Sequence, residues 1–405
     1  DGKTTTSNFI YEILKAAGHS TGMISTVNAQ IGDEVLDTGF HVTTPEAFEA
    51  QRYLRQMVDA SLTHAVLEMT SIGLAQQRGA RPSEFDLAVV TNITHEHLDN
   101  HGSYEAYFEA KARLVDGLEL PTAKLHPIER LAVINHDDQS YAGLAERGEA
   151  RRLSYGLSDD ADLYAVDIEN RPGQLSFRLQ GAGLDFPVET SMFGAYNVYN
   201  ALAAIGATVI GLGIAPEHAQ AGIANLQGVP GRMERIDLGQ DFTAIVDFAH
   251  TPFALEAALK AGRQLTEGRV IAVFGSAGLR DKAKRRMMAE TSADLADLTV
   301  LTAEDPRTES LDDILAEMAA GAKAKGGVEG ETFWRVPDRG AAISFALLQA
   351  QPGDLLLVLG KGHEQSMCFG EIEYDWDDRT ALRAALAELL GVEGPEMPVL
   401  PTSKS

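Results

Sequence analysis

Hydrophobic positions along the chain follow two patterns, one helical and one extended. Between Ser7 and Ala17 the apolar residues recur three and four positions apart, which predicts a helix that ends at Gly18. Pro45 to Ala60 repeats this helical spacing. Short apolar runs follow these helices and predict strands at Thr21 to Val27, Ala65 to Met69 and Phe85 to Val90. Strands that alternate with helices predict a parallel sheet, with chemistry on the loops beyond the carboxyl ends of the strands.

The pattern changes after residue 123 and again near residue 234. The first change brings strands close together with Gly and Pro between them, at Leu131 to Asn135, Ala161 to Ile168, Gln174 to Leu179 and Leu184 to Thr190. Asn197 to Gly211 is rich in Ala and Leu and predicts a buried helix. A second α/β pattern then begins near Arg235, with strands at Thr243 to Phe248, Val270 to Phe274, Leu298 to Thr302 and Leu355 to Leu359. Gly and Pro cluster from Gly228 to Glu234, which predicts a hinge between two domains.

Composition narrows the possible functions. The 405 residues are 44% hydrophobic and 23% charged, as expected for two or three globular domains. A net charge of −25 argues against electrostatic binding to nucleic acid or to an anionic membrane. Cys368 is the single cysteine, which excludes an internal disulfide and suits a reducing compartment. No apolar run approaches the roughly 20 residues that span a bilayer, so we expect no membrane insertion and a cytoplasmic protein.

The first six residues, Asp1-Gly2-Lys3-Thr4-Thr5-Thr6, match the second half of the phosphate-binding motif G-x-x-x-x-G-K-[ST]. In such a loop, backbone N–H groups surround phosphates, the lysine neutralises them and the next hydroxyl reaches Mg²⁺. A helix follows, as the motif requires. The first glycine and a preceding strand are missing, so we expect a chain that begins inside the loop. A chance Gly-Lys-Thr is the alternative.

Three further sites carry candidate chemistry, and each has a plain structural alternative. Glu68 ends an apolar run, where an acid suits either a Mg²⁺ ligand or a solvated strand end. Residues 91–101, TNITHEHLDNH, hold three histidines and two acids, which as a group indicate a metal or phosphate site. Lys111 lies on an amphipathic helix, where spacing alone favours a solvated side chain.

Motifs in a fixed order resemble the Mur ligase family of ATP-dependent ligases over nearly the whole chain, and most of all the members that add the third residue of the peptidoglycan stem peptide. Any one motif is weak evidence, whereas eleven in order are strong. They are DGKTTT (1–6), TTPE (43–46), LEMTSIGL (67–74), TNITHEHLDNHG (91–102), EAKARL (109–114), FGAYNVYNALAA (193–204), GRME (231–234), VDFAHTP (246–252), FGSAGLRDKAKRR (274–286), EDPR (304–307) and GKGHE (360–364).

The resemblance implies an α/β fold in two domains and a short tail. A central P-loop ATPase domain with a mainly parallel sheet and a small β-rich subdomain would occupy residues 1–233. A Rossmann-like ligase domain would occupy 234–395, with 396–405 as a flexible tail. We also expect a monomer.

The resemblance also implies a role for each matched residue. ATP contacts are expected at Gly2, Lys3, Thr4, Thr5, Asn197, Asn200, Arg232, Asp247 and Lys282. Two Mg²⁺ ions are expected, with ligands Thr4, Glu68, His97 and a carbamylated Lys111, whose added carboxylate would overturn the solvated alternative above. Substrate contacts are expected at Thr43, Thr44, Thr70, Ser71, Arg280, Asp305, Arg307, Gly360 and Glu364.

The implied reaction passes the γ-phosphoryl group of ATP to a carboxylate of a UDP-muramoyl peptide, and the amine of an amino acid then attacks the acyl phosphate. Lys3 and Lys111 would act in phosphoryl transfer, and His250 as a base for the amine. A His250→Ala enzyme with normal turnover would exclude the last role.

Two departures from the family pattern bear on the substrate. Ile72 stands where the family has histidine, in Thr70-Ser71-Ile72. Asp305 stands where D-N-P-R, common in enzymes that add diaminopimelate, has Asn, and its charge would favour lysine or ornithine. Arg307 is suited to bind a carboxylate through two parallel hydrogen bonds.

Two alternatives to a cell-wall ligase stay open. A folylpolyglutamate synthetase-like ligase shares the ATPase and the last domain, although EDPR, GKGHE and TTPE argue against it. A non-catalytic nucleotide-binding homologue is opposed by the intact Lys3, Glu68, His97 and Lys111.

Overall fold

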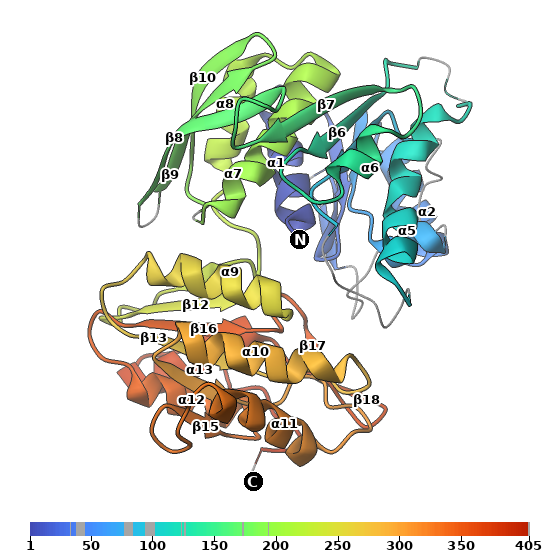
Figure 1. Ribbon diagram of the computed structural model, residues 1–405. Helices are drawn as coiled ribbons and strands as arrows, with labels where there is room; N and C mark the ends of the chain where they lie inside the picture. Colours follow the sequence, from blue (N-terminus) through green and yellow to red (C-terminus); the bar gives the residue numbers. More distant parts are fainter. Residues whose placement is uncertain are drawn as a thin grey trace. The chain divides into compact units, whose positions relative to one another are not determined.

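The computed structural model describes residues 1–403 except 33, 38–44, 77–83, 94–101, 123, 125–126, 172–173 and 193. The chain divides into two compact units, Asp1–Gln227 and Gly228–Ser405 (Figure 1). The predicted boundary lay six residues further on, at 233. Within the described part of the chain, no helix has both the length and the apolar character that a membrane crossing needs.

Helices and two sheets build the N-terminal unit. Its helices are α1 (Lys3–Ala16), α2 (Ala47–Asp59), α3 (Ser71–Ala75), α5 (Tyr104–Asp116), α6 (Tyr141–Ala145), α7 (Tyr196–Ile205) and α8 (Pro216–Asn225). The first sheet has the order β3-β2-β1-β4, from β1 (Thr21–Ile24), β2 (Asn28–Ile31), β3 (Glu34–Asp37) and β4 (His64–Leu67). Here β1 and β4 are parallel, whereas β2 and β3 run antiparallel to their neighbours.

The second sheet of this unit changes from parallel to antiparallel along its width. Its order is β10-β9-β8-β7-β6-β5, from β5 (Leu87–Val90), β6 (Leu131–Asn135), β7 (Arg151–Gly156), β8 (Leu163–Arg171), β9 (Gln174–Gly181) and β10 (Leu184–Thr190). Strands β5 to β8 are parallel, whereas β9 runs antiparallel to both β8 and β10. All of β6 is buried, whereas β9 and β10 bury largely alternate residues, as expected of strands with one wet face.

Helix α1 is central to the N-terminal unit because it packs against α7, α8 and β1. Phe9 and Ile13 of α1 are fully buried. The predicted long helix from Asn197 ends early as an α-helix, and Gly206–Gly211 continues it with π-helical turns. There the Thr208 hydroxyl donates to the Ala204 carbonyl at 2.8 Å, and bonding of a side chain to the preceding turn loosens the helical ladder.

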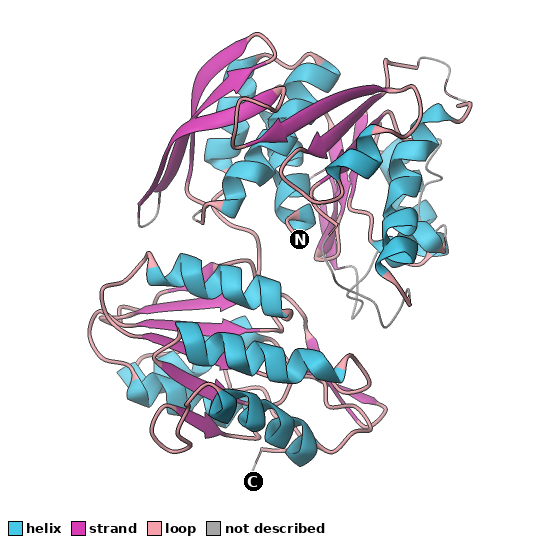
Figure 2. Cartoon of the chain, in the orientation of Figure 1, coloured by secondary structure: helices cyan, strands magenta, loops and turns pink. Residues whose placement is uncertain are grey.

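The C-terminal unit is a doubly wound α/β sheet (Figure 2). Its order is β11-β12-β16-β13-β14-β15, from β11 (Glu234–Ile236), β12 (Thr243–Asp247), β13 (Val270–Phe274), β14 (Leu298–Leu301), β15 (Phe333–Arg335) and β16 (Leu355–Leu359). From β12 to β15 the strands are parallel. A separate hairpin pairs β17 (Ser366–Phe369) with β18 (Ile372–Asp375). The predicted α/β class and parallel-rich sheets are therefore confirmed.

Helices cover both faces of this sheet. On one face α10 (Lys282–Leu295) packs between α9 (Pro252–Arg263) and α11 (Leu311–Ala324), and on the other α12 (Arg339–Gln349) pairs with α13 (Asp378–Leu390). Strands β13 and β16 are entirely buried, which explains their unbroken apolar sequences. Leu400, within the predicted flexible tail, is 2% exposed and belongs to the same core, so the tail packs at this residue.

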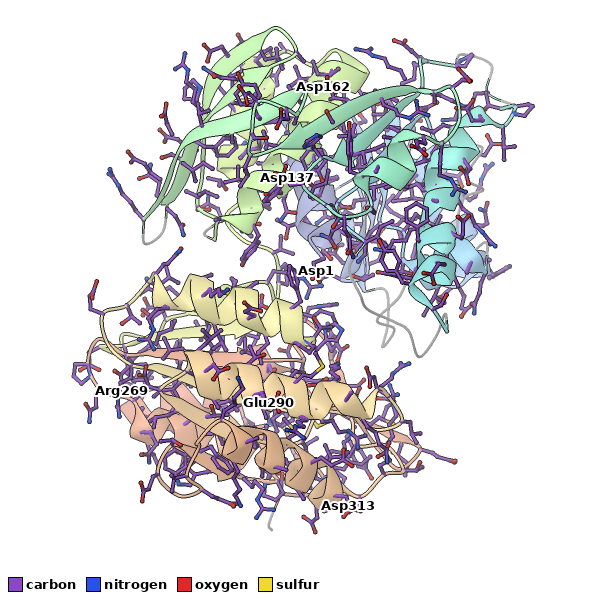
Figure 3. All side chains as sticks on the ribbon, in the orientation of Figure 1. Asp1, Asp137, Asp162, Arg269, Glu290 and Asp313 are labelled. Atoms are coloured by element: carbon purple, nitrogen blue, oxygen red, sulfur yellow. The ribbon has the colours of Figure 1, made fainter. Side chains whose placement is uncertain are left out.

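The chain crosses the sheet in one direction from β12 to β15, then reverses and returns to place β16 between β12 and β13. The loops that follow β12, β13, β14 and β16 gather at the carboxyl ends of the strands, where doubly wound proteins bind their ligands. At the opposite edge, Arg269 (Figure 3) pairs with Asp354 at 2.7 Å and joins the start of β13 to the start of β16.

Candidate active site

The phosphate-loop residues lie at the carboxyl ends of strands in the N-terminal unit. Gly2 caps α1 with φ 76°, and Asp1 (Figure 3) is tied to the end of β5, since its carbonyl accepts from the Thr91 hydroxyl at 2.8 Å. The Asn92 side-chain amide also donates to the Asp1 carbonyl, at 3.1 Å. Lys3 begins α1, so backbone N–H groups of the helix end point toward the loop, as anion binding requires.

Glu68 lies beside this helix end. The Thr4 hydroxyl donates to Glu68 Oε1 at 3.1 Å, and the Thr26 amide donates to Oε2 at 3.2 Å. Glu68 is 4% exposed and Thr4 3%. A buried hydroxyl and carboxylate in contact are hard oxygen donors of the kind that Mg²⁺ prefers, so these residues fit the ion. His97, Thr43 and Thr44 lie outside the described residues.

Lys111 on α5 is buried, at 8% exposed, and not solvated as spacing alone suggested. Its ammonium donates to the Asn92 carbonyl at 3.1 Å and lies 4.9 Å from the centre of the Tyr107 ring. Asn92 is also the residue that holds Asp1, so Lys111 and the phosphate loop share a partner. As an ammonium, Lys111 has no lone pair to offer a metal, and a carbamate on Nζ would provide oxygen ligands.

Asn197 and Asn200 of α7 pack against the phosphate loop. Asn200 donates to Asn197 Oδ1 at 2.8 Å and accepts from the Thr6 hydroxyl at 3.3 Å. A Cβ atom at Gly2 would lie 2.2 Å from Asn200 Oδ1, so only glycine fits there. The Tyr199 hydroxyl donates to Asp137 (Figure 3) at 2.9 Å, which joins α7 to the end of β6.

The predicted substrate residues Thr70 and Ser71 begin α3. The Thr70 hydroxyl accepts from the Gly73 amide at 3.1 Å and so caps the helix, and Ser71 is 5% exposed. Thr5 is buried within α1.

In the C-terminal unit, Asp247 ends β12 and fixes two neighbouring segments. Its carboxylate accepts from the Met233 amide at 2.7 Å and the Ala249 amide at 2.9 Å. Burial raises the pKa of Asp247, while the charge of Arg232 opposes the shift. His250 Nδ1 lies 2.9 Å from the Phe248 carbonyl, which can only accept. In neutral His250 the proton is therefore on Nδ1 and the lone pair on Nε2.

Charged side chains of both signs gather in the crevice beyond the carboxyl ends of β14 and β16, where the cations Lys361, Arg339 and Lys284 act on the Glu304 carboxylate. Lys361, at 2% exposed, lies 3.0 Å from Asp305 Oδ1 and also pairs with Glu364. The Cys368 amide donates to the same Asp305 oxygen at 3.0 Å. Asp305 therefore interacts with Lys361 and the Cys368 amide of the protein itself. These contacts argue against the expectation that its charge selects the substrate directly.

Glu304 is the functional candidate that the sequence reasoning missed. It is 6% exposed, its Oε2 atom is buried with no hydrogen-bond partner among the described residues, and burial raises its pKa. A Cβ atom at Gly360 would lie 2.6 Å from that oxygen, so the carboxylate sits directly against the end of β16. Glu304 is the first residue of the EDPR motif, three residues after the last residue of β14, but its unsatisfied oxygen is visible only in the structure.

The loop that follows Glu304 has a strained backbone. Asp305 and Arg307 have φ values of 40° and 53°, in the left-handed region that non-glycine residues rarely adopt. Such conformations cost of the order of 1–3 kcal/mol each and concentrate at functional sites. The Arg307 amide donates to the Cys368 carbonyl at 3.1 Å, and its guanidinium donates to the Gly278 carbonyl at 3.4 Å.

Arg280 and Lys282 belong to the loop after β13 and the first turn of α10. Lys282 is exposed and lies 3.9 Å from Glu309. The Gly278 amide donates to the Asp305 carbonyl at 2.9 Å, so the loop with Arg280 and the loop with Arg307 are joined. A cavity of about 680 Å³ beside them is lined by Leu279, Lys282, Glu309, Ser310, Asp313 (Figure 3), Ala316 and Glu317.

Comparison with known proteins gives matches over both units. The Mur ligase middle domain matches residues 1–208, and the Mur ligase glutamate ligase domain matches 231–362. The UDP-N-acetylmuramyl-tripeptide synthetase of Roseiflexus sp. (strain RS-1) is 43% identical over 394 residues, which are 96% of this chain and 77% of the relative. The UDP-N-acetylmuramoyl-L-alanyl-D-glutamate–2,6-diaminopimelate ligase of Geobacillus thermodenitrificans (strain NG80-2) is 39% identical, with the same coverage.

Solved structures agree with these matches. A structure of a UDP-N-acetylmuramoyl-L-alanyl-D-glutamate–2,6-diaminopimelate ligase has a TM-score of 0.63 and 31% identity, and covers 96% of this chain and 77% of its own. The folylpolyglutamate synthase of Mycobacterium tuberculosis, complexed with ADP and AMPPCP, has a TM-score of 0.68, with coverages of 97% and 90%. Its identity of 16% makes it a likeness of fold alone.

The raised pKa of Glu364 predicts a pH-dependent stability. Burial, with the charges of Asp305 and Glu304, raises that pKa from 4.5 to about 7, although Lys361 opposes the shift. The folded state therefore binds more protons than the unfolded state between these values, and stability falls as pH rises through this window. We expect a Glu364→Gln variant to lack this fall, which should amount to on the order of 1–3 kcal/mol.

The measurement is urea unfolding of both proteins at about pH 5 and about pH 8. A fall of the same size in the Gln variant would show that Glu364 does not titrate in this window.

Proposed function

The chain belongs to the Mur ligase family and is an ATP-dependent ligase, and we propose that it adds a diamino acid to UDP-N-acetylmuramoyl-L-alanyl-D-glutamate in peptidoglycan synthesis. Residues 1–233 would serve as the ATP-binding domain and 234–395 as the ligase domain. The observation that carries the amino-acid half of the proposal is the buried Glu304 carboxylate, whose Oε2 atom has no hydrogen-bond partner among the described residues, because a substrate ammonium would supply the missing donor.

The N-terminal unit would bind ATP. Lys3 and the amides at the start of α1 hold the phosphates, with Gly2, Thr4 and Thr5 in the same loop. Thr4 and Glu68 are proposed to hold Mg²⁺, which neutralises phosphate charge in phosphoryl transfer. Asn197 and Asn200 are bonded to each other and to this loop, so they would support it as well as contact adenine. Thr70 and Ser71, with Thr43 and Thr44, are proposed for the acyl acceptor.

Lys111 is proposed to carry a carbamate. Its burial beside the phosphate loop supports this role, because a side chain used only for solubility would be exposed. The modified residue, with His97, would hold a second Mg²⁺. Carbamylation turns a cation into an anion, so the same position would change from repelling to attracting the ion.

The C-terminal unit would bind the amino acid. Glu304 and Glu364 are proposed to accept hydrogen bonds from an ammonium group of the amino acid. Arg307 and Arg280 are proposed to bind the oxygens of its carboxylate. Gly360 leaves room for the Glu304 carboxylate. Asp305 would act by holding Lys361 and the Cys368 amide. Arg232, Asp247 and Lys282 are proposed for the nucleotide.

His250 is proposed as the base for the attacking amine. The contact of Nδ1 with the Phe248 carbonyl places the lone pair on Nε2, as proton abstraction requires. A cytoplasmic location and a monomeric state stay predictions.

The central prediction concerns phosphate release from MgATP by protein expressed from its complete reading frame. We expect release to require both UDP-N-acetylmuramoyl-L-alanyl-D-glutamate and one diamino acid. The assay tests this acceptor and a folate, each in combination with diaminopimelate, lysine, ornithine or glutamate. Release that requires folate and glutamate would replace the proposal with the folylpolyglutamate alternative, and the preferred diamino acid would identify the third residue of the stem peptide.

Loss of the carbamate should abolish activity. Lys111→Arg keeps the positive charge but cannot be carbamylated, so we expect phosphate release to fall by at least about 100-fold, the size of losing one charge-stabilising group. After labelling with ¹³C-bicarbonate, the wild type should give a carbamate carbon signal by NMR that the variant lacks. An active Lys111→Arg enzyme, or a signal common to both proteins, would contradict the modification.

Glu304 should determine the affinity for the diamino acid. A Glu304→Gln variant keeps the shape but removes the charge, so we expect KM for the diamino acid to rise about 10- to 100-fold, as for a lost hydrogen bond to a charged group. KM for ATP should stay unchanged. Glu371→Gln, at an exposed acid beside the β17–β18 turn, is the matched control. An unchanged KM for the diamino acid in Glu304→Gln would assign the buried carboxylate to another role.

A further inference from the structure

Four side chains from three separate segments form one stack in the C-terminal unit. Phe248 and His250 follow β12, His363 follows β16, and Arg232 precedes β11. The Arg232 guanidinium carbon lies 4.3 Å from the centre of the Phe248 ring. The rings of His250 and His363 lie 4.4 Å and 5.0 Å from the same ring, tilted by 59° and 54°. Phe248 is therefore the common partner of the other three.

The hydrogen bonds of the two histidines fix opposite tautomers. Arg232 Nη1 lies 3.4 Å from His363 Nδ1, and because a guanidinium only donates, this nitrogen of His363 accepts. In neutral His363 the proton is then on Nε2. In neutral His250 the proton is on Nδ1, because that atom faces the Phe248 carbonyl. The stack therefore offers a donor at Nε2 of one histidine and an acceptor at Nε2 of the other.

The guanidinium of Arg232 gains a defined position from the Phe248 ring. An arginine side chain has about 2 kcal/mol of rotamer entropy to lose, and a flat ring face restricts it before any ligand arrives. A guanidinium over an aromatic ring is attracted to it by about 0.5–2 kcal/mol. Asp247 adds a second restraint on this segment, because its carboxylate accepts from the Met233 amide next to Arg232.

We propose that Phe248 is a positioning residue of the ligase, which holds Arg232, His250 and His363 in the arrangement that turnover requires. Phe248 itself would touch neither phosphate nor amine. This inference rests on the proposed function, since it assumes that Arg232 serves the nucleotide and His250 the amine. It gives Phe248 of VDFAHTP the role of a positioning residue and makes His363 of GKGHE one of the residues that it positions. The motifs alone explained neither residue.

The test compares Phe248→Leu with Phe248→Tyr in protein from the complete reading frame. Leucine fills the space but offers no ring, so we expect kcat to fall and KM for ATP to rise, with a combined loss of about twofold to thirtyfold in kcat/KM for ATP. KM for the diamino acid should not change, because the ring contacts described for Phe248 are with Arg232, His250 and His363 and not with Glu304. Phe248→Tyr keeps the ring face and should restore kcat and KM for ATP to wild-type values.

Phe345→Leu is the matched control. Phe345 is a half-buried aromatic residue of the same unit, 5.3 Å from the Trp334 ring, and it belongs to no part of the proposed site. We expect this variant to keep wild-type kinetic constants even where its melting temperature falls. Wild-type kcat and KM for ATP in Phe248→Leu would overturn the inference, as would equal losses in Phe248→Leu and Phe248→Tyr. Absence of ligase activity in the wild type would instead refute the proposed function.

Discussion

The guanidinium of Arg339 is the interaction on which the amino-acid crevice depends. Arg339 is fully buried and pairs through two hydrogen bonds with Asp378, at 2.7 Å and 2.6 Å. Its other hydrogen bonds go to the Ala303 carbonyl at 3.0 Å and the Leu359 carbonyl at 2.8 Å. These carbonyls immediately precede Glu304 and Gly360. One buried cation therefore holds the ends of β14 and β16 together, and removing its partner would leave an uncompensated charge that costs about 3–5 kcal/mol.

The hydrogen bonds of Arg339 hold the strand ends in place, and this support allows backbone strain and an unsatisfied carboxylate oxygen in the residues that follow. Left-handed conformations at Asp305 and Arg307, and a buried oxygen of Glu304 without a partner, are each unfavourable alone. They persist because the strand ends cannot relax toward one another. A substrate ammonium that reached Glu304 would donate the hydrogen bond that its Oε2 atom lacks in the free protein. The unfavourable free energy of the unsatisfied oxygen would then be relieved on binding, which would favour the complex.

The sequence predicted the elements whose stability is local, and missed those that depend on their neighbours. Strands β6, β10, β13 and β16 begin and end at the predicted residues, because long apolar runs or strict alternation define them. Strand β7 (Arg151–Gly156) was missed, since its sequence RRLSYG is not an apolar run and the strand is defined by its pairing with β6 and β8. Lys3, Thr4 and Glu68 were predictable from a motif. Glu304 was not, because the absence of a hydrogen-bond partner is visible only when the surrounding groups are in place.

The charge of the crevice also indicates which amine of a diamino acid it would hold. Carboxylates near an ammonium favour its charged form and so raise its pKa, whereas an attacking amine must be uncharged. If Glu304 and Glu364 bound the reacting amine, they would oppose the reaction they serve. They are suited to the distal ammonium, which takes no part in the reaction, and which they would keep protonated for recognition. His250, whose lone pair is on Nε2, is suited to the reacting amine. The two amines of one substrate would then meet opposite electrostatic environments, and an amino acid with a single amine would leave Glu304 Oε2 without a hydrogen-bond donor.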